Sequence, residues 1–149
     1  MNYHLAELNI ARMLYQMDDP RFSGFVNRLE EINTLAEQSK GFIWRLKTDE
    51  GDAMSIRAFE DDMLIINMSV WESIEDLYQY TYYTAHAELF RQRQDWFEHL
   101  KEPMFAMWWV PEGHIPDLEE AKEKLELIRL KGPTAEAFHF KKRFDPPTS

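Results

Sequence analysis

Residues 71–109 read WESIEDLYQYTYYTAHAELFRQRQDWFEHLKEPMFAMWW, and this stretch decides the fold. Ser73 follows an apolar run and has the character of a helix N-cap, with Asp76 three residues later. Two helical patterns come next, and Pro103 prevents the second from continuing. The stretch ends in the run 104–110, which is apolar on both faces and is typical of a fully buried strand.

Strands are predicted on both sides of this stretch. Residues 3–10 alternate, so that one face of a strand carries His4, Ala6, Leu8 and Ile10. Short apolar runs predict further strands, and a polar segment between two of them predicts a loop at Thr48–Asp52. The predicted strands are 3–10, 42–46, 63–70 and 104–110, with a short closing strand at 137–140.

Two more helices complete the pattern. The first begins at Asp19 and Pro20, a carboxylate cap followed by proline in the first turn, and ends at Gly41. The last begins at Pro116 and ends at Gly132, and its inward positions are Leu118, Ala121, Leu125 and Ile128. The order is therefore β-α-β-β-α-β with a helical C-terminal extension.

This order predicts an α+β domain with a ferredoxin-like antiparallel sheet and helices on one face. We expect one domain at 1–140 and a poorly ordered tail at 141–149. The strands at 63–70 and 104–110 are apolar on both faces, which indicates that both faces of the sheet are covered. With helix enough for one face, the other is expected to meet a second copy of the chain, giving a homodimer through the sheet face.

Composition narrows the class of partner. The chain has 149 residues, a formal net charge of −10 and no cysteine. The negative charge argues against nucleic acid and against an anionic membrane surface. The absence of cysteine excludes disulfides and thiolate chemistry. The first residues lack the pattern of a signal peptide, and no apolar run approaches the ~20 residues of a membrane helix, so we expect a cytoplasmic protein.

His86 is the first candidate for chemistry. It lies between Tyr83 and Phe90 on a predicted helix, and an imidazole titrates near neutral pH, which suits a general base. The alternative is a core histidine bonded to a hydroxyl or a backbone carbonyl. The five histidines are scattered without ligand spacing, so no metal site is predicted.

Polar residues on apolar strands form the second group of candidates. They are Glu7, Asn9, Asn67 and Ser69, and they would line a small-molecule pocket if their faces look toward the helices. In that pocket Asn9 is a catalytic candidate beside His86, while Asn67, Trp71 and Tyr83 are ligand-binding candidates. The alternative places these polar groups at strand ends or across a dimer, and the tryptophans in the core or an interface.

Several short motifs, in order, resemble an uncharacterised bacterial family of the dimeric α/β-barrel superfamily, similar to antibiotic-biosynthesis-monooxygenase domains. These motifs are Gly41-Phe-Ile-Trp-Arg-Leu46, Ser69-Val-Trp-Glu-Ser73, Tyr83-x-x-His86, Arg93-x-x-Trp96-Phe97 and Trp108-Trp-Val-Pro-x-Gly-His-x-Pro116. The resemblance runs from about Tyr3 to Phe140. It implies a shared fold with a pocket between sheet and helices, and no single chemistry.

The resemblance leaves three functions open. The first is a small-molecule binding protein or cofactor-independent monooxygenase-like enzyme acting on a small aromatic or hydrophobic ligand. The second is a non-catalytic dimeric structural or binding protein, so whether the chain is an enzyme stays open. The third is haem binding or degradation, because haem degraders of the superfamily use an Asn, a Trp and a His at places comparable to Asn9, Trp71 and His86. The separation of Trp71 from His86 is longer than in those enzymes.

Overall fold

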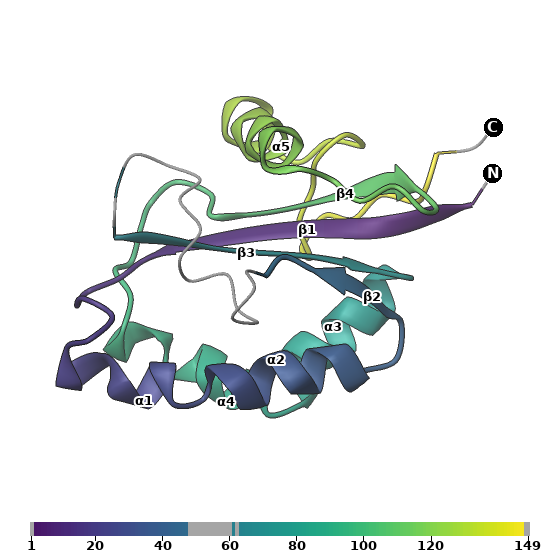
Figure 1. Ribbon diagram of the computed structural model, residues 1–149. Helices are drawn as coiled ribbons and strands as arrows, with labels where there is room; N and C mark the ends of the chain where they lie inside the picture. Colours follow the sequence, from purple (N-terminus) through teal and green to yellow (C-terminus); the bar gives the residue numbers. More distant parts are fainter. Residues whose placement is uncertain (1, 48–60, 62, 148–149) are drawn as a thin grey trace.

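The computed structural model describes residues 2–47, 61 and 63–147, so the predicted loop at Thr48–Asp52 lies outside the described residues. Four antiparallel strands form one sheet in the order β2-β3-β1-β4 (Figure 1). The strands are β1 (Tyr3–Arg12), β2 (Phe42–Arg45), β3 (Leu64–Trp71) and β4 (Phe105–Pro111). The two central strands, β1 and β3, are adjacent in the sheet although they are not consecutive in the sequence, as the β-α-β-β-α-β order requires. The predicted α+β fold is confirmed.

The helices lie on both sides of this sheet (Figure 1). Below it are the short helix η1 (Pro20–Phe22), α1 (Ser23–Val26), α2 (Leu29–Gln38), α3 (Ile74–Tyr83), α4 (His86–Arg91) and the short helix η2 (Arg93–Asp95). Above it is α5 (Leu118–Lys131), the predicted C-terminal extension. Asp117 caps this helix, because its Oδ1 accepts from Glu120 N–H at 2.8 Å.

Both lower helical segments are divided, and only the division of the first was not predicted. Asp19 caps the first turn, accepting from Arg21 N–H at 2.9 Å. The helix then changes pitch near Arg28, whose N–H bonds only three residues back, to Phe25 O at 3.1 Å. In the second segment Thr84 is extended, with φ −125° and ψ −174°, which separates α3 from α4. The continuous helix predicted from Asp19 to Gly41 is therefore wrong in detail, whereas the two helical runs predicted after Ser73 agree with the break at Thr84.

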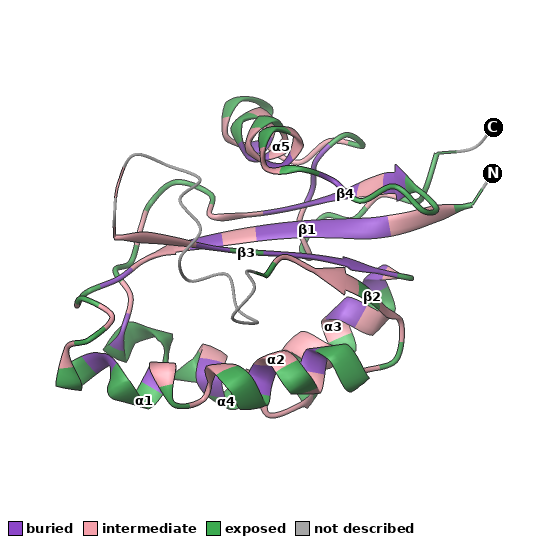
Figure 2. Cartoon of the chain, in the orientation of Figure 1, coloured by how far each residue is buried: buried purple, intermediate pink, exposed green. Residues whose placement is uncertain are grey.

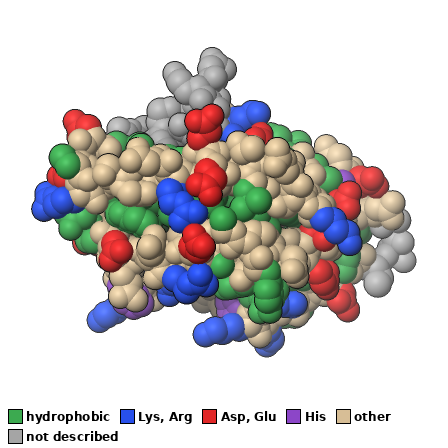
Figure 3. All heavy atoms as spheres, turned by 90° about the horizontal axis from the view of Figure 1, so that it is seen from below, with side chains coloured by type: hydrophobic (Ala, Val, Ile, Leu, Met, Phe, Trp, Pro, Cys, Tyr) green, Lys and Arg blue, Asp and Glu red, His purple; other side chains and the backbone are tan. Residues whose placement is uncertain are grey.

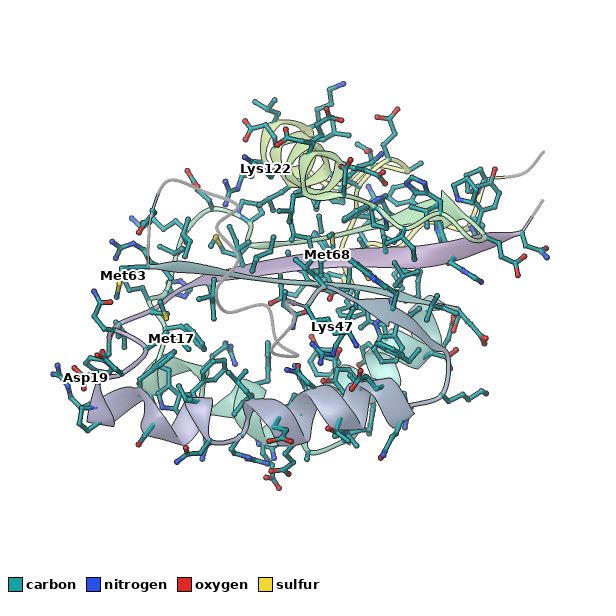
Figure 4. All side chains as sticks on the ribbon, in the orientation of Figure 1. Met17, Asp19, Lys47, Met63, Met68 and Lys122 are labelled. Carbon is teal, nitrogen blue, oxygen red and sulfur yellow. The ribbon has the colours of Figure 1, made fainter. Side chains whose placement is uncertain are left out.

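The sheet has a separate apolar core on each face. On the α5 side, Ala6 and Leu8 of β1 and Met68 of β3 pack under Leu125 and neighbouring residues of α5. On the opposite side, which α1 to α4 cover and which we call the helix side, Leu5 and Trp71 belong to a second core. Figure 2 shows β1 buried along most of its length, and in Figure 4 Met68 lies on the α5 side. The predicted alternation of β1 is confirmed.

The face predicted to meet a second copy is covered within one chain. Ala6, Leu8 and Val70 are fully buried and Trp108 nearly so, and Ala121, Leu125 and Ile128 of α5 lie in the same cluster. The premise that the chain has helix for one face only is therefore wrong. The reason is that the C-terminal extension folds back over β1 and β4, instead of joining the other helices. The homodimer itself stays a prediction.

A β-bulge at Ile43 sets the direction of the β2 side chains. Phe42 pairs with Trp71 and Trp44 with Val70, so two steps on β2 match one step on β3. As a result Phe42 packs in the helix-side core and Trp44 in the α5-side core. The next residue, Arg45, is paired with Ser69 and therefore faces the helices. Regular alternation from Phe42 would have turned Arg45 to the other face.

The chain ends along the free edge of β4. The predicted closing strand at 137–140 is one bridge, in which Phe138 and Met107 exchange two backbone hydrogen bonds of 2.8 and 2.9 Å. In the tail that was expected to be poorly ordered, Trp109 Nε1 donates to Phe144 O at 2.8 Å. The Phe144 ring also contacts Phe138, with centroids 5.8 Å apart. No helix of the described residues is long and apolar enough to span a membrane.

Candidate functional site

The site is built around Glu7, a carboxylic acid buried in the middle of the sheet. Glu7 lies on the helix-facing side of β1, and only 3% of its surface is exposed. Ser69 Oγ donates to Glu7 Oε1 at 2.7 Å, and Asn9 Nδ2 donates to Glu7 Oε2 at 3.1 Å. Ser69 in turn accepts from Trp71 Nε1 at 2.9 Å. A connected set of polar groups thus satisfies the buried carboxyl.

The sheet register brings these residues together. Glu7 pairs with Ser69 across β1 and β3, and Asn9 pairs with Asn67. Side chains of directly paired residues point to the same face, so all four lie on the helix-facing side. This explains why four polar residues, spread over two segments far apart in sequence, make one cluster. We call Glu7, Asn9, Ser69 and Trp71 the Glu7 network.

The Glu7 network lies between two apolar clusters on the helix side. One cluster contains Leu5, Trp71 and Met107, and the other contains Met13, Ile32 and Leu89. In Figure 4, Met17 and Met63 mark the second cluster, at the α1 end of the sheet. Between the clusters Asn67 is exposed although it lies within the central strand β3, whereas Glu7 and Ser69 are buried. The row of polar side chains therefore reaches solvent at Asn67.

Burial changes the proton affinity of Glu7. It raises the pKa of this carboxyl to about 7, against the opposing effect of the hydrogen bonds from Ser69 and Asn9. A carboxyl that titrates near neutral pH can both accept and release a proton under physiological conditions. The donors around it are arranged for the carboxylate form. When Glu7 is protonated, its hydroxyl needs a hydrogen-bond acceptor. The Asn9 amide oxygen can accept this bond if the amide group rotates by 180°, and so can a bound molecule.

Tyr80 connects this network to His86. The Tyr80 ring stacks on Trp71, with centroids 5.1 Å apart, and contacts the His86 ring at 4.9 Å. Burial and the negative charge of Glu7 raise the pKa of the Tyr80 hydroxyl well above its ordinary value, while Arg45 opposes this. Tyr80 is therefore a neutral hydrogen-bonding group, and its hydroxyl donates to Ile32 O at 3.3 Å.

His86 is held in one orientation behind Tyr80. Its Nδ1 lies 3.1 Å from Thr81 O, and since a carbonyl only accepts, Nδ1 carries the proton. Burial lowers the pKa of His86, so the neutral ring with a lone pair on Nε2 is favoured. The ring also stacks on Phe90 at 6.5 Å. The bond to a backbone carbonyl is the one that the alternative to a general base called for, but His86 is half-buried and not part of the core, and its role in chemistry stays a prediction.

Of the other predicted site residues, some lie at the Glu7 network and one lies away from it. Asn9 and Trp71 belong to the Glu7 network, and Asn67 lies beside it, opposite Asn9. Tyr83 does not reach the site, because it is 66% exposed and contacts Tyr78 on the outer side of α3. Sequence reasoning ranked Glu7 only as one polar residue among four. The signal was present, because an acidic residue at an inward position of an otherwise apolar strand must be protonated, paired or functional.

A pair of cations lies at the β2 edge of the same face. Glu37 Oε2 of α2 is 3.6 Å from Arg45 Nε and 3.7 Å from Lys47 Nζ. In Figure 4, Lys47 lies between the sheet and α2. Both cations thus lie within ion-pair distance of the Glu37 carboxylate, beside the Glu7 network. Figure 3, seen from the helix side, shows basic and acidic groups intermingled on the outer surface of this layer.

The residues do not fit a haem of the kind that superfamily haem degraders hold. Asn9 and Trp71 are engaged with Glu7 and Ser69. His86 instead contacts Tyr80 and Phe90, and Tyr80 stands between it and Trp71. The three residues thus do not converge on one space. Among the described residues there is also no group of three or more His, Asp or Glu side chains placed to hold a metal ion.

Two open grooves lie elsewhere on the described surface. One, of about 390 Å³, runs between the end of α2 and the start of α3 and includes Lys40, Asp76 and one side of Tyr80. The other, of about 290 Å³, lies on the outer side of α5. Charged surface residues dominate the α5 groove, and the groove beside α3 touches the Glu7 network only through Tyr80. Neither groove is lined by a cluster of buried, hydrogen-bonded polar side chains such as the Glu7 network.

Comparison with known families places the chain. A model described as "Domain of unknown function (DUF3291)" matches residues 4–149. The chain belongs to the DUF3291 family. No curated protein matches it. Among solved structures, it is similar to PA3566 from Pseudomonas aeruginosa at 9% identity and a TM-score of 0.48, over 76% of this chain and 98% of that one.

Proposed function

We propose that this DUF3291 protein binds a small, largely apolar molecule on the helix-facing side of its sheet, and that Glu7 exchanges a proton with it. The observation that carries the proposal is a buried carboxyl, held by Asn9 and Ser69, next to the accessible Asn67. The stacked rings of Trp71, which is buried, and Tyr80 form the apolar surroundings beside it. A few polar groups in an apolar frame are the usual composition of a small-molecule site.

The reaction class that this arrangement favours is base-assisted chemistry without a cofactor, as in a monooxygenase-like enzyme. The Glu7 carboxylate accepts the proton of an acidic phenol or quinol, and burial makes that carboxylate more basic than an ordinary one. Asn9 and Ser69 hold the carboxyl in place while it changes charge. His86 takes a positioning role, since it fixes Tyr80 and does not adjoin Glu7 in the network.

The experiment combines binding and turnover. A set of phenols, quinols and flat aromatic compounds is screened by thermal shift, and binders are followed by oxygen uptake. The variant is Glu7→Gln, which keeps the shape of the side chain but holds no titratable proton. The control is Glu112→Gln, which also removes one carboxylate, but on the surface beside Asn2.

We expect Glu7→Gln to retain binding and to lose turnover by about 10²-fold or more, the size of a missing general base. Glu112→Gln should match the unmodified protein. Equal turnover of all three proteins would overturn the role of Glu7. Failure of every compound to bind would leave the second candidate, a non-catalytic protein, which the close aromatic packing of Phe42, Trp71 and Tyr80 supports.

We also propose that the family lies in the dimeric α/β-barrel superfamily and that the chain forms a homodimer. The order of the sequence motifs and the strand order β2-β3-β1-β4 support this placement. Because α5 covers much of the outer face of the sheet, a second copy would meet α5 and the sheet edges as well as the sheet face.

A further inference from the structure

The two oxygens of the Glu7 carboxyl have different surroundings. Oε1 accepts from Ser69 Oγ at 2.7 Å, and Oε2 accepts from Asn9 Nδ2 at 3.1 Å. Ser69 is buried, whereas Asn9 is half-buried and is the cross-strand partner of the exposed Asn67. The carboxyl therefore has an inner oxygen, Oε1, and a second oxygen, Oε2, on the side where the polar row reaches solvent.

Trp71 fixes the direction of the hydrogen bond at Oε1. An indole N–H can only donate, so Trp71 Nε1 gives its hydrogen to Ser69 Oγ, 2.9 Å away. The Ser69 hydroxyl keeps its own hydrogen for Glu7 Oε1, because an ionised carboxylate can only accept. We call Trp71, Ser69 and Glu7 the Trp71 relay. Both of its donors point the same way, and each bond in such a chain strengthens the next.

A proton on Oε1 would conflict with the Trp71 relay. The protonated oxygen and the Ser69 hydroxyl would each direct a hydrogen at the other, and one hydrogen would have to turn away from its acceptor. An unmet donor is costly at a buried position. Oε2 has no such conflict, because the Asn9 amide carries a donor and an acceptor, and its rotation brings Oδ1 to the place of Nδ2.

The other titratable groups on this side of the sheet keep one charge near neutral pH. Burial and the charge of Glu7 raise the pKa of the Tyr80 hydroxyl well above its ordinary value, so Tyr80 stays neutral. Burial lowers the pKa of His86, which lies behind Tyr80, so it is neutral as well. Arg45, the cross-strand neighbour of the relay on β2, stays positive, since a guanidinium keeps its proton in proteins. Among these groups, Glu7 is the one whose charge changes near pH 7.

From this arrangement we infer that Trp71 and Ser69 are positioning residues, which reserve Oε1 as an acceptor and leave Oε2 as the atom that exchanges the proton. The ligand approaches from the side of Asn9 and Asn67. Its hydroxyl proton passes to Oε2, which leaves the ligand as an anion and Glu7 neutral. Trp71 stays buried and acts only through Ser69. This inference rests on the proposed function, because it assigns roles to the residues around the same base.

The experiment follows the Trp71 relay by NMR, through the titration of Glu7, in the folded full-length protein. In nitrogen-labelled protein the indole N–H signals report on the tryptophans, and the side-chain amide signals report on Asn9. Trp71→Phe and Asn9→Ala identify these signals by their disappearance. Ser69→Ala removes the middle of the relay and leaves both of its ends in place.

Two controls accompany this titration. The first is the indole of Trp109, which donates to a backbone carbonyl, that of Phe144, at 2.8 Å. The second is Ser23→Ala, because Ser23 also donates at 2.7 Å, but to Pro20 O at an exposed position. The carboxyl signal of Glu7 is recorded in every variant, and circular dichroism shows which variants are folded.

We expect the indole signal of Trp71 to shift with the same midpoint as the carboxyl signal of Glu7, while that of Trp109 stays constant. The amide signal of Asn9 should change strongly at this midpoint, because its bond to Oε2 is replaced. Ser69→Ala should abolish the shift of the Trp71 signal. It should also raise the pKa of Glu7 by about one pH unit, the effect of losing one hydrogen bond to a charged group.

Trp71→Phe should raise the pKa of Glu7 by less than Ser69→Ala does, since Trp71 acts through Ser69. Ser23→Ala should leave the pKa of Glu7 unchanged. If Trp71→Phe fails to fold, the unmodified protein and Ser69→Ala still decide, because the first carries the Trp71 signal and the second tests whether Ser69 conveys its shift.

Three results separate the parts of the inference. A Trp71 signal that is constant through the titration, or that keeps its shift in Ser69→Ala, would overturn the relay. A Trp71 indole hydrogen that begins to exchange with water as Glu7 takes up its proton, beside an unchanged Asn9 amide, would place the proton on Oε1 and overturn the choice of Oε2. If all signals behave as expected but no phenol or quinol is turned over, the proposed function fails while the relay stands.

Discussion

At the scale of single residues, Gly41 shows how tightly the turn before β2 is fitted. Its φ of +83° lies in the region that favours glycine, and a Cβ there would be 2.1 Å from Asp76 Oδ2. Gly113 has a similar φ of +92° with nothing within 4 Å. Gly113→Ala should therefore lose about 1–2 kcal/mol of unfolding free energy, the cost of the backbone alone. Gly41→Ala should lose more, and chemical denaturation of the two variants measures the difference. Equal losses would mean that Asp76 moves aside without cost.

Glu7 gives the second prediction at this scale. Its pKa is raised from 4.5 in the unfolded chain to about 7 in the folded protein, so folding favours the protonated form. This contribution to stability is complete below pH 4.5 and is lost as the pH rises to about 7. At 1.36 kcal/mol per pKa unit the loss is about 3 kcal/mol. Glu7→Gln has no such proton, so its stability relative to the unmodified protein should rise by that amount between pH 4 and pH 8. A constant difference across this range would contradict the burial of an ionisable Glu7.

At the scale of elements, α5 is the part that completes the fold. Leu125 is 2% exposed and packs on the sheet, whereas Leu130 of the same helix is 74% exposed. Leu125→Ala should cost about 2–5 kcal/mol, and Leu130→Ala less than about 0.5 kcal/mol. Thermal or chemical denaturation compares the two directly. Similar small losses would show that α5 is not anchored on the sheet.

The elements also show what sequence can and cannot predict here. The four strands of the sheet, the caps at Asp19 and Ser73, and the two-sided burial of β3 and β4 follow from local patterns and are confirmed, whereas the predicted closing strand at 137–140 is only one bridge. The position of α5 in the fold does not follow from local patterns. The sequence of an amphipathic helix shows which of its faces is apolar, but not against which surface that face will pack. The bulge at Ile43 left no sequence signal, so the direction of Arg45 had to come from the strand pairing.

At the scale of the whole molecule, the site forms where β1 and β3, which carry the Glu7 network, meet Tyr80 of α3. Asn9 and Trp71, which the sequence offered as catalytic and ligand-binding candidates, lie in the Glu7 network, and those roles stay predictions. His86 and Tyr83 were chosen by their position on a helix. Helical position alone could not show that His86 would bond Thr81 O or that Tyr83 would point outward. The central role of Glu7 depends on burial and cross-strand partners, which only the assembled sheet provides.

The positions of Asn9, Trp71 and His86 in the folded chain also predict whether the protein binds haem. Since Asn9, Trp71 and His86 do not converge, titration with hemin should give no saturable shift of the Soret band. His86→Ala should behave like the unmodified protein in this titration. A one-to-one shift that His86→Ala abolishes would show that the helix layer rearranges to hold the group.

The proposed site depends most on the protonation state of the Glu7 carboxyl, which can be observed directly. Carbon NMR of protein labelled at the glutamate side-chain carboxyls, compared with Glu7→Gln to identify the signal, gives the pKa of Glu7. The predicted result is a titration centred at about 7, set by burial against the hydrogen bonds from Ser69 and Asn9. A titration near 4.5, the ordinary value, would place Glu7 in water and contradict the site.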